Sequence, residues 1–375
     1  MFNKKEIDRK GLEQSARDKT FLIMAGGTGG HVYPALATAT KLIQENDKVV
    51  WLGSVGGMEE SVVKNAGIPF YGISVKGVRG KGILSKLLSP IRIAWAILQA
   101  LKVVTVVKPD AVLGMGGFAS GPGGFAAKIL GKPLLIHEQN AVAGMTNRIL
   151  AKFSTKVMTA FPGAFPEEVP VKQTGNPLRE QIIDIYYQPQ IAIEKERRIK
   201  LLVLGGSLGA MGLNLGVPAA LGKIEPSLQP EIWHQTGKNK AEETKAAYQT
   251  HGVEAKISAY IGDMAEAYQW ADFVICRAGA LTISELCIAG LGAILVPYPY
   301  AVDDHQTKNA SSMVKSGAAW ILPQRDLSPE TLAEILKPLL SKRERISILS
   351  EAAHKLGQPD ATQKVVAECR SVCYA

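Results

Sequence analysis

The chain has 375 residues, of which 46% are apolar and 21% are charged. This balance excludes an extended disordered chain and provides material for two domains of about 150–200 residues. The four cysteines form no CxxC pair and have no metal-ligand spacing with histidines, so we expect a reducing compartment. Residues 1–20 are polar and lack the apolar stretch of about 7–15 residues that a signal peptide needs. We expect them to form a flexible cytosolic extension.

The net charge of +9 is concentrated in the first half of the chain. Residues 1–180 carry 23 Lys and Arg against 13 Asp and Glu, whereas the remainder carries 20 against 21. The stretch 61–109 contains no acidic residue at all. A one-sided basic field is typical of proteins that bind nucleic acid or anionic lipid.

Short apolar runs alternate with helical patterns along the first half, and most of the joints between them are rich in glycine. A buried strand is predicted at 21–25, then a glycine loop, then a helix with Pro34 in its first turn, where the missing N–H costs little. Further strands are predicted at 48–53, 111–117 and 133–140. Repeated strand–loop–helix units predict a parallel sheet with crossover helices.

The same pattern restarts at residue 201, which predicts a second doubly wound domain. Its strands end in polar or glycine loops within 201–210, 231–237, 255–264, 271–282 and 293–300. We therefore expect an extension at 1–20, a domain at 21–186, a linker at 187–200 and a second domain at 201–357. Ligands of open parallel sheets bind beyond the carboxyl ends of the strands, so we expect the site in a cleft between the two domains.

The loop Gly26–Gly30 follows the first predicted strand and opens a helix, and His31 comes directly after it. Glycines there let backbone N–H groups approach an anion at a helix N-terminus. His31 could act as a base, bind an acceptor substrate or simply donate to a backbone carbonyl. No Walker loop is present. A dinucleotide site is disfavoured, since Gly53 ends the strand where an NAD-binding fold places an acidic residue.

Three further motifs could carry chemistry. The run 137–140 (HEQN) is either a polar turn or a hydrogen-bonding rim, with Glu138 a possible base. The loop 205–210 repeats the anion-binding pattern with Ser207. In the stretch 277–285, Thr282 and Glu285 match a capping box, although Glu285 could also bind ribose hydroxyls.

No metal or other cofactor is expected to be required. Asp303, Asp304 and His305 form a poor ligand set, and the chain contains no DxD motif that would hold a divalent ion against a diphosphate. We expect helix N-termini and cationic side chains to stabilise the charge on the leaving group.

The basic and apolar segment 77–108 is too interrupted by charge and proline to predict a membrane-spanning helix. It is either a core-facing helix or an interfacial patch. Its single aromatic residue, Trp95, gives no RNA-binding signature, so a membrane surface is favoured over nucleic acid. The predicted membrane patch comprises Lys76, Arg79, Lys81, Ile83, Leu84, Lys86, Leu87, Leu88 and Arg92.

Ten ordered motifs between residues 25 and 310 resemble those of the MurG family, the bacterial transferases that convert lipid I to lipid II in peptidoglycan synthesis. They are AGGTGGHVYPALA, GVRGKG, VLGMGGFASGPGG, IHEQNAVAGMTNR, FPGAFP, GNPLR, LGGSLGA, WHQTGK, CRAGALTISE and DDHQTKNA. The resemblance covers nearly everything after Thr20. It implies an α/β GT-B fold with two Rossmann-like domains, an interdomain cleft and a C-terminal helix, about 358–375, that packs back on the first domain.

The resemblance also implies the substrates and the site. The donor would be UDP-N-acetylglucosamine and the acceptor undecaprenyl-diphospho-N-acetylmuramoyl-pentapeptide (lipid I), at the cytoplasmic face of an anionic bacterial inner membrane. Cell-wall synthesis proteins are possible partners, and nucleic acid is not expected. The implied catalytic bases are His31 or Glu138, a choice that the pattern leaves open. The implied donor-binding residues are Thr28, Gly29, Gly30, Asn140, Arg179, Ser207, Ile261, Ala280, Leu281, Thr282, Ile283, Ser284, Glu285 and Gln306.

Overall fold

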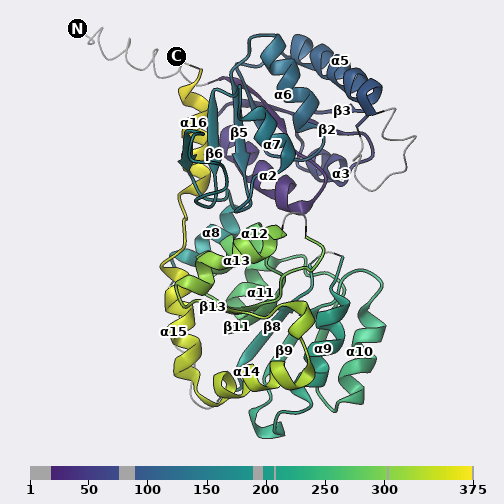
Figure 1. Ribbon diagram of the computed structural model, residues 1–375, viewed down its shortest axis with the longest axis vertical. Coiled ribbons are helices and arrows are strands. Elements are labelled where there is room, and N and C mark those ends of the chain that lie inside the picture. The colour runs from purple at the N-terminus through teal and green to yellow at the C-terminus, as the bar shows by residue number, and fades with distance from the viewer. Residues whose placement is uncertain (1–17, 76–88, 189–196, 207, 302–303, 374–375) are drawn as a thin grey trace, which may run out of the picture. The chain divides into compact units, whose positions relative to one another are not determined.

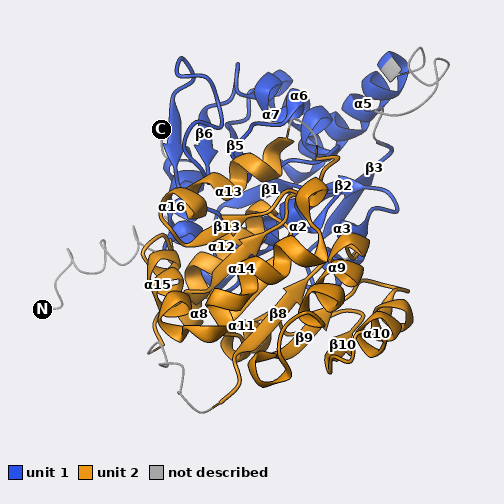
Figure 2. Ribbon diagram, turned by 60° about the horizontal axis from the view of Figure 1, so that its bottom comes forward, with its two compact units in different colours: residues 1–179, 360–375 blue, residues 180–359 orange. Residues whose placement is uncertain are grey.

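The computed structural model describes residues 18–75, 89–188, 197–206, 208–301 and 304–373 (Figure 1). Contacts divide the chain into unit 1, residues 1–179 and 360–375, and unit 2, residues 180–359 (Figure 2). This division precedes the boundary expected at residue 186, because helix α8 (Glu180–Tyr186) packs against α11 (Met264–Trp270) and α12 (Ala280–Ala289) of unit 2. Residues 1–17 of the expected extension and most of the expected linker lie outside the described residues.

Unit 1 contains a seven-stranded parallel sheet in the order β3-β2-β1-β4-β5-β6-β7. The first strand lies in the interior of the sheet, so the chain winds outward from it in both directions. The strands are β1 (Thr20–Met24), β2 (Lys48–Ser54), β3 (Phe70–Ile73), β4 (Ala111–Gly114), β5 (Leu134–Glu138), β6 (Lys156–Thr159) and β7 (Val171–Gln173).

Alternate residues of these strands point to two separate cores, as the period of two in a strand requires. Phe21 and Ile23 face a core with α2 (Gly29–Gln44), α3 (Met58–Asn65) and α16 (Ala361–Ser371). Leu22 and Met24 face the opposite core, which is closed by three other helices. Those helices are α5 (Ser89–Val107), α6 (Ser120–Ile129) and α7 (Met145–Leu150).

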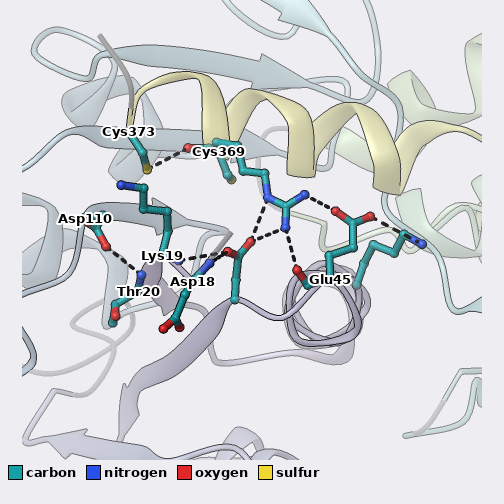
Figure 3. A network of polar contacts seen from close by, with 10 residues as sticks. Asp18, Lys19, Thr20, Glu45, Asp110, Cys369 and Cys373 are labelled. Atoms are coloured by element: carbon teal, nitrogen blue, oxygen red, sulfur yellow. Dashed lines mark hydrogen bonds and ion pairs between the residues drawn. The ribbon is translucent and has the colours of Figure 1, made fainter. Parts of the chain in front are cut away.

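The C-terminal helix α16 belongs to unit 1, and its polar side chains fix it there (Figure 3). Arg370 pairs with Glu45 and with the buried Asp47, whose other oxygen accepts a hydrogen bond from the Lys19 amide. Glu368 on the same helix accepts from two lysines of β6 and β7. These contacts join the last helix to the segments just before β1 and β2 and to the strands β6 and β7.

Unit 2 contains a six-stranded parallel sheet in the order β10-β9-β8-β11-β12-β13, so its first strand also lies in the interior. One face is covered by α9, α10, α14 and α15 around a large apolar core. α12 contacts α8, α11 and α13. The remaining elements are β8 (Lys200–Leu204), α9 (Met211–Leu221), β9 (Glu231–Gln235), α10 (Ala241–Thr250), β10 (Lys256–Ser258), β11 (Phe273–Cys276), β12 (Gly292–Leu295), α13 (His305–Lys315), β13 (Ala319–Ile321), α14 (Pro329–Ser341) and α15 (Arg343–His354), with short 3-10 turns at Pro226–Leu228 and Gln324–Asp326.

The two Rossmann-like units confirm the predicted fold class. In each unit, as predicted, a glycine loop follows the carboxyl end of the first strand, which is β1 in unit 1 and β8 in unit 2. That strand is where the winding direction reverses, which is the usual ligand-binding position of such sheets.

Candidate active site

Two glycine loops of unit 1 meet at the carboxyl ends of β1 and β4, which are neighbours in the sheet. A Cβ atom at Gly117 would lie 2.2 Å from the carbonyl oxygen of Gly26, and one at Gly116 would lie 2.6 Å from Cδ2 of His31. Gly116 and Gly117 also have positive φ angles of 90° and 84°. Larger residues at these positions would push the two loops apart.

His31 lies in the first turn of α2, directly after the first glycine loop. Its Nδ1 atom is 3.2 Å from the hydroxyl oxygen of Thr28, and the ring packs beside Gly116. The half-buried imidazole is therefore oriented by Thr28, whose hydroxyl can donate to Nδ1 or accept from it. A histidine held in this way at a glycine loop is suited to general-base chemistry.

Glu138 ends β5 and is almost fully buried, at 3% exposure. Its Oε1 accepts from the backbone N–H and from the side-chain amide of Asn140, both at 3.1 Å. Its Oε2 accepts from the Gly144 amide at 3.1 Å and from Nδ2 of Asn147 at 2.9 Å. The carboxylate thus organises the loop that leads into α7.

His137 and Gln139 of the HEQN run are also buried. His137 contacts the carbonyl of Gly175 through Nε2 at 2.9 Å, and burial lowers its pKa to about 4. Gln139 Nε2 lies 3.1 Å from His137 Nδ1. Of the two readings of this run, the structure favours an internal network over a rim of exposed hydrogen-bonding groups, although Asn140 is partly exposed.

Arg179 is the last residue of the first segment of unit 1, and it is brought to the start of α2. Its guanidinium carbon lies 5.3 Å from the ring centroid of Tyr33, and the Tyr33 ring in turn packs beside Gly29. The structure therefore gathers Thr28, His31 and Arg179 around the first turn of α2. A cation at a helix N-terminus next to a glycine loop favours an anionic ligand.

In unit 2, the glycine loop after β8 interlocks with the loop after β9. A Cβ at Gly209 would lie 1.9 Å from the carbonyl oxygen of Thr236, and one at Gly237 would lie 2.3 Å from the Gly209 nitrogen. Lys240 donates to the Leu208 carbonyl at 2.8 Å. Ser207 itself lies outside the described residues, so its proposed contact with phosphate stays a prediction.

The stretch 280–285 forms the first turns of α12, and the capping-box alternative for it is wrong. The N-cap is Gly279, which has no side-chain cap, and Thr282 lies inside the helix. Glu285 is 5% exposed, and its Oε2 accepts a hydrogen bond from the Tyr268 hydroxyl at 2.9 Å. Ile261, which is also buried, donates its amide to the side chain of Gln235 at 2.9 Å.

Arg277 has a structural role that the sequence analysis did not assign. Its guanidinium donates to the carbonyls of Val296 and Pro297 at 3.1 and 3.2 Å and to the Gln324 side chain at 2.5 Å. Burial lowers its pKa from the ordinary value, although it stays a cation at neutral pH. Gln306 accepts from the Tyr298 amide at 2.8 Å, next to the same loop. The only signal in the sequence was the presence of Arg277 at the start of a glycine motif.

Among the described residues, no group of three or more His, Cys, Asp or Glu side chains is arranged to hold a metal ion. Asp303 lies outside the described residues. Asp304 accepts from the Thr307 hydroxyl at 2.7 Å at the start of α13.

Of the predicted membrane patch, only Arg92 lies within the described residues, and it is exposed on α5; the other eight residues fall in 76–88. By length and mean hydropathy, Pro90–Val107 could cross a membrane, and 22% of it is buried. Charges and proline were expected from the sequence to interrupt any such helix. Three of the six basic residues of the segment 77–108 precede Pro90, so the apolar run that follows is longer than expected. Ala96, Ala100 and Val104 of the helix pack on the sheet, so α5 is part of the fold of unit 1.

Two parallel Rossmann-like units, each with a glycine loop after its first strand, are the architecture of the GT-B fold. Residues 21–159 match the model of the glycosyltransferase family 28 N-terminal domain, and residues 200–365 match that of the C-terminal domain. The chain therefore belongs to glycosyltransferase family 28, and within it to the MurG group.

The relatives within that group are similar over nearly their whole length. The chain is 51% identical to the UDP-N-acetylglucosamine–N-acetylmuramyl-(pentapeptide) pyrophosphoryl-undecaprenol N-acetylglucosamine transferase of Marinobacter nauticus, over 94% of this chain and 97% of the relative. It is 48% identical to the transferase of the same name from Saccharophagus degradans, over 99% and 95%. The crystal structure of Acinetobacter baumannii MurG has 41% identity and a TM-score of 0.79, with 94% of this chain and 99% of that chain covered.

Proposed function

We propose that this chain transfers N-acetylglucosamine from UDP-N-acetylglucosamine to the C4 hydroxyl of lipid I, which gives lipid II and UDP. The observation that carries this conclusion is 51% identity to an N-acetylglucosamine transferase over nearly the full length of both chains. Glycine loops at the ligand-binding position of both sheets support it. The reaction forms a bond from the acceptor oxygen to the anomeric carbon and breaks the bond from that carbon to UDP. Direct displacement inverts the configuration at the anomeric carbon.

The donor is proposed to bind mainly on unit 2. In unit 1, donor-binding roles stay predictions for Thr28, Gly29, Gly30, Asn140 and Arg179. The first turns of α12 supply backbone N–H groups, and Ile261 and Glu285 supply contacts to the uracil and the ribose. The Tyr268 hydroxyl holds the Glu285 carboxylate in one orientation, so little rotamer freedom is lost on binding. Gln306 is proposed to contact the sugar. Arg277 adds positive charge to this unit, which stabilises the leaving diphosphate.

His31 is the better candidate for the general base. Both oxygens of Glu138 are already engaged, each by two N–H donors, so removing a proton from a substrate would require one of these bonds to break. His31 is partly exposed and is oriented by Thr28. A positioned base contributes about 10²–10⁴-fold to rate, and holding two substrates in place contributes on the order of 7–11 kcal/mol at best.

The His31→Ala variant tests this assignment. We expect kcat to fall by about 10²–10⁴-fold, while the affinity for UDP-N-acetylglucosamine, measured by calorimetry, stays within about twofold because the donor binds unit 2. His251→Ala is the matched control, since His251 is exposed on unit 2. A weaker donor affinity at unchanged kcat would make His31 a binding residue instead.

The face of unit 1 formed by α5, α6 and α7 is proposed to lie on the cytoplasmic surface of an anionic membrane. Between Ser61 and Pro166 the only acidic residues are Asp110 and Glu138, and neither belongs to these three helices. Exposed apolar and basic side chains occur on all three helices: Ile91, Arg92, Trp95, Leu98 and Lys102 on α5, Phe125, Lys128 and Ile129 on α6, and Met145, Arg148 and Ile149 on α7. Each basic residue near an anionic surface contributes about 1 kcal/mol.

Sedimentation with lipid vesicles tests this proposal. Replacing Ile91, Trp95 and Leu98 with Ser should weaken binding to vesicles that contain phosphatidylglycerol and leave donor affinity unchanged. Leu215→Ser, on the exposed face of α9 in unit 2, is the control. Equal sedimentation of the triple variant and the wild type would place the membrane contact elsewhere. Equal sedimentation with neutral phosphatidylcholine vesicles would remove the role of the basic residues.

A further inference from the structure

A carboxylate lies beneath the first glycine loop and is not used in the mechanism above. Glu59, in the first turn of α3, has 0% exposure. Among the described residues no Lys, Arg or His forms an ion pair with it. Its hydrogen-bond donors are backbone amides: Oε1 accepts from Ser54 at 2.9 Å and Oε2 accepts from Gly27 at 3.3 Å. A buried charged group with this environment costs folding energy, and that cost calls for an explanation.

The space around the carboxylate is made by glycines of two separate loops. A Cβ atom at Gly26 would lie 2.3 Å from Oε1, and one at Gly57 would lie 2.4 Å from Oε2. A Cβ at Gly53 would lie 3.0 Å from Cγ of Glu59. Glycines therefore leave room for this carboxylate on several sides. The Glu59 carboxylate connects the loop after β1, through the Gly27 amide, with the end of β2, through the Ser54 amide.

The same loop is held from its other side by the second glycine motif. Gly117 packs directly on the peptide of Gly26, where a Cβ would lie 2.2 Å from the carbonyl oxygen and 2.7 Å from the nitrogen. Gly27 has a φ of 91°, and α2 begins two residues later with Thr28 as its N-cap. Glu59 and Gly117 thus fix the position of the loop just before the residues that carry Thr28 and His31.

We infer that Glu59 is a positioning residue for the transfer reaction, which acts by fixing the first glycine loop so that His31 meets the acceptor hydroxyl. This inference rests on the proposed role of His31. Two N–H groups converge on two oxygens, and a carboxylate accepts from both at once. A carboxamide of the same shape would present its own N–H group to one of these donors.

The test is Glu59→Gln, with Glu60→Gln as the matched control. Glu60 is the next residue of the same helix turn, is partly exposed and pairs with Lys64. We expect Glu59→Gln to lower kcat by about 10–100-fold, because displacements near 1 Å at a catalytic group cost about that much. The affinity of unit 2 for UDP-N-acetylglucosamine should stay within twofold, and Glu60→Gln should match the wild type in both measurements.

A second variant displaces the carboxylate without removing it. Gly57 has a φ of −72°, so Ala is compatible with its backbone, but the added Cβ would meet the Glu59 carboxylate. Gly57→Ala should therefore reproduce the loss in kcat, and it replaces Glu59→Gln if calorimetry shows that the latter does not fold. If both variants fold and both retain kcat within twofold, the inference is wrong.

The double variant with His31→Ala separates positioning from general weakening of the fold. If Glu59 acts through the loop that carries His31, Glu59→Gln should add little to the loss already caused by His31→Ala. Losses that multiply fully would assign Glu59 a structural role only. If His31→Ala alone retained full kcat, the proposed base would be wrong, whereas a lowered kcat in Glu59→Gln would still show that the loop position matters.

Discussion

Glu138→Gln distinguishes a structural carboxylate from a catalytic base. The carboxylate accepts four hydrogen bonds, from two groups of Asn140, from the Gly144 amide and from Asn147. Whichever way the new carboxamide turns, its oxygen retains two donors and its NH₂ group faces the other two. Because the substitution preserves shape, the expected effect comes from these hydrogen bonds alone.

The loss of stability depends on whether each N–H donor that loses the carboxylate finds another acceptor. Gly144 is exposed, so water can accept from its amide. The Asn147 side chain could turn, because its Oδ1 has no partner, but it would then lose its 3.1 Å bond to the His137 carbonyl. One or two hydrogen bonds to a charged group are lost, about 2–3 kcal/mol in all. For a domain of about 150–250 residues this corresponds to a decrease in Tm on the order of 4–12 °C.

The assay combines calorimetry with a pH profile of kcat. We expect the transition of unit 1 to shift down while kcat falls by at most about 100-fold and keeps its acid limb, because His31 still accepts the proton. Glu167→Gln, an exposed carboxylate of the same unit, should change neither quantity. A loss of more than about 1000-fold at unchanged Tm would refute the reasoning and make Glu138 the base.

Two further predictions concern the C-terminal helix and the metal requirement. Burial raises the pKa of Glu368. Hydrogen bonds from Lys156 and Lys172 outweigh this effect, so the pKa lies below its ordinary value of 4.5. The contribution of the ionised Glu368 to stability is therefore complete above about pH 4.5 and is lost as the pH falls below that value. Glu368→Gln should reduce this decrease of Tm at acid pH. An unchanged decrease would contradict the prediction. Excess EDTA should leave turnover intact, because helix N-termini and Arg277 are expected to stabilise the diphosphate; full loss of activity would require a metal.

The fold could be predicted from the sequence because each of its signals is local. Apolar runs of strand length, glycine loops and Pro34 in a first helical turn all occur within a few residues of each other, and the structure places two Rossmann-like units on them. The assignment of α8 to unit 2 could not be predicted in this way. It depends on packing against α11 and α12, which lie far along the chain.

The sequence points to candidate residues where a motif itself bears the chemistry, as at His31 and the glycine loops, and their roles stay predictions. Residues that act through distant backbone groups were missed. Glu59 contacts amides of Ser54 and Gly27, and Arg277 contacts carbonyls of Val296 and Pro297, and no sequence pattern encodes those pairings. The capping box failed for a related reason, since the helix begins before Thr282.

Different charged side chains hold the loops of the two units, although the two sheets share the order of their first six strands. In unit 2, strand β11 pairs with the first strand, β8. The loop after β11 carries the cation Arg277, which donates to two backbone carbonyls. In unit 1 the loop after the first strand lies on the carboxylate of Glu59. Arg277 adds positive charge to the unit where the anionic donor is proposed to bind, whereas Glu59 holds the loop that leads to His31 through the Gly27 amide.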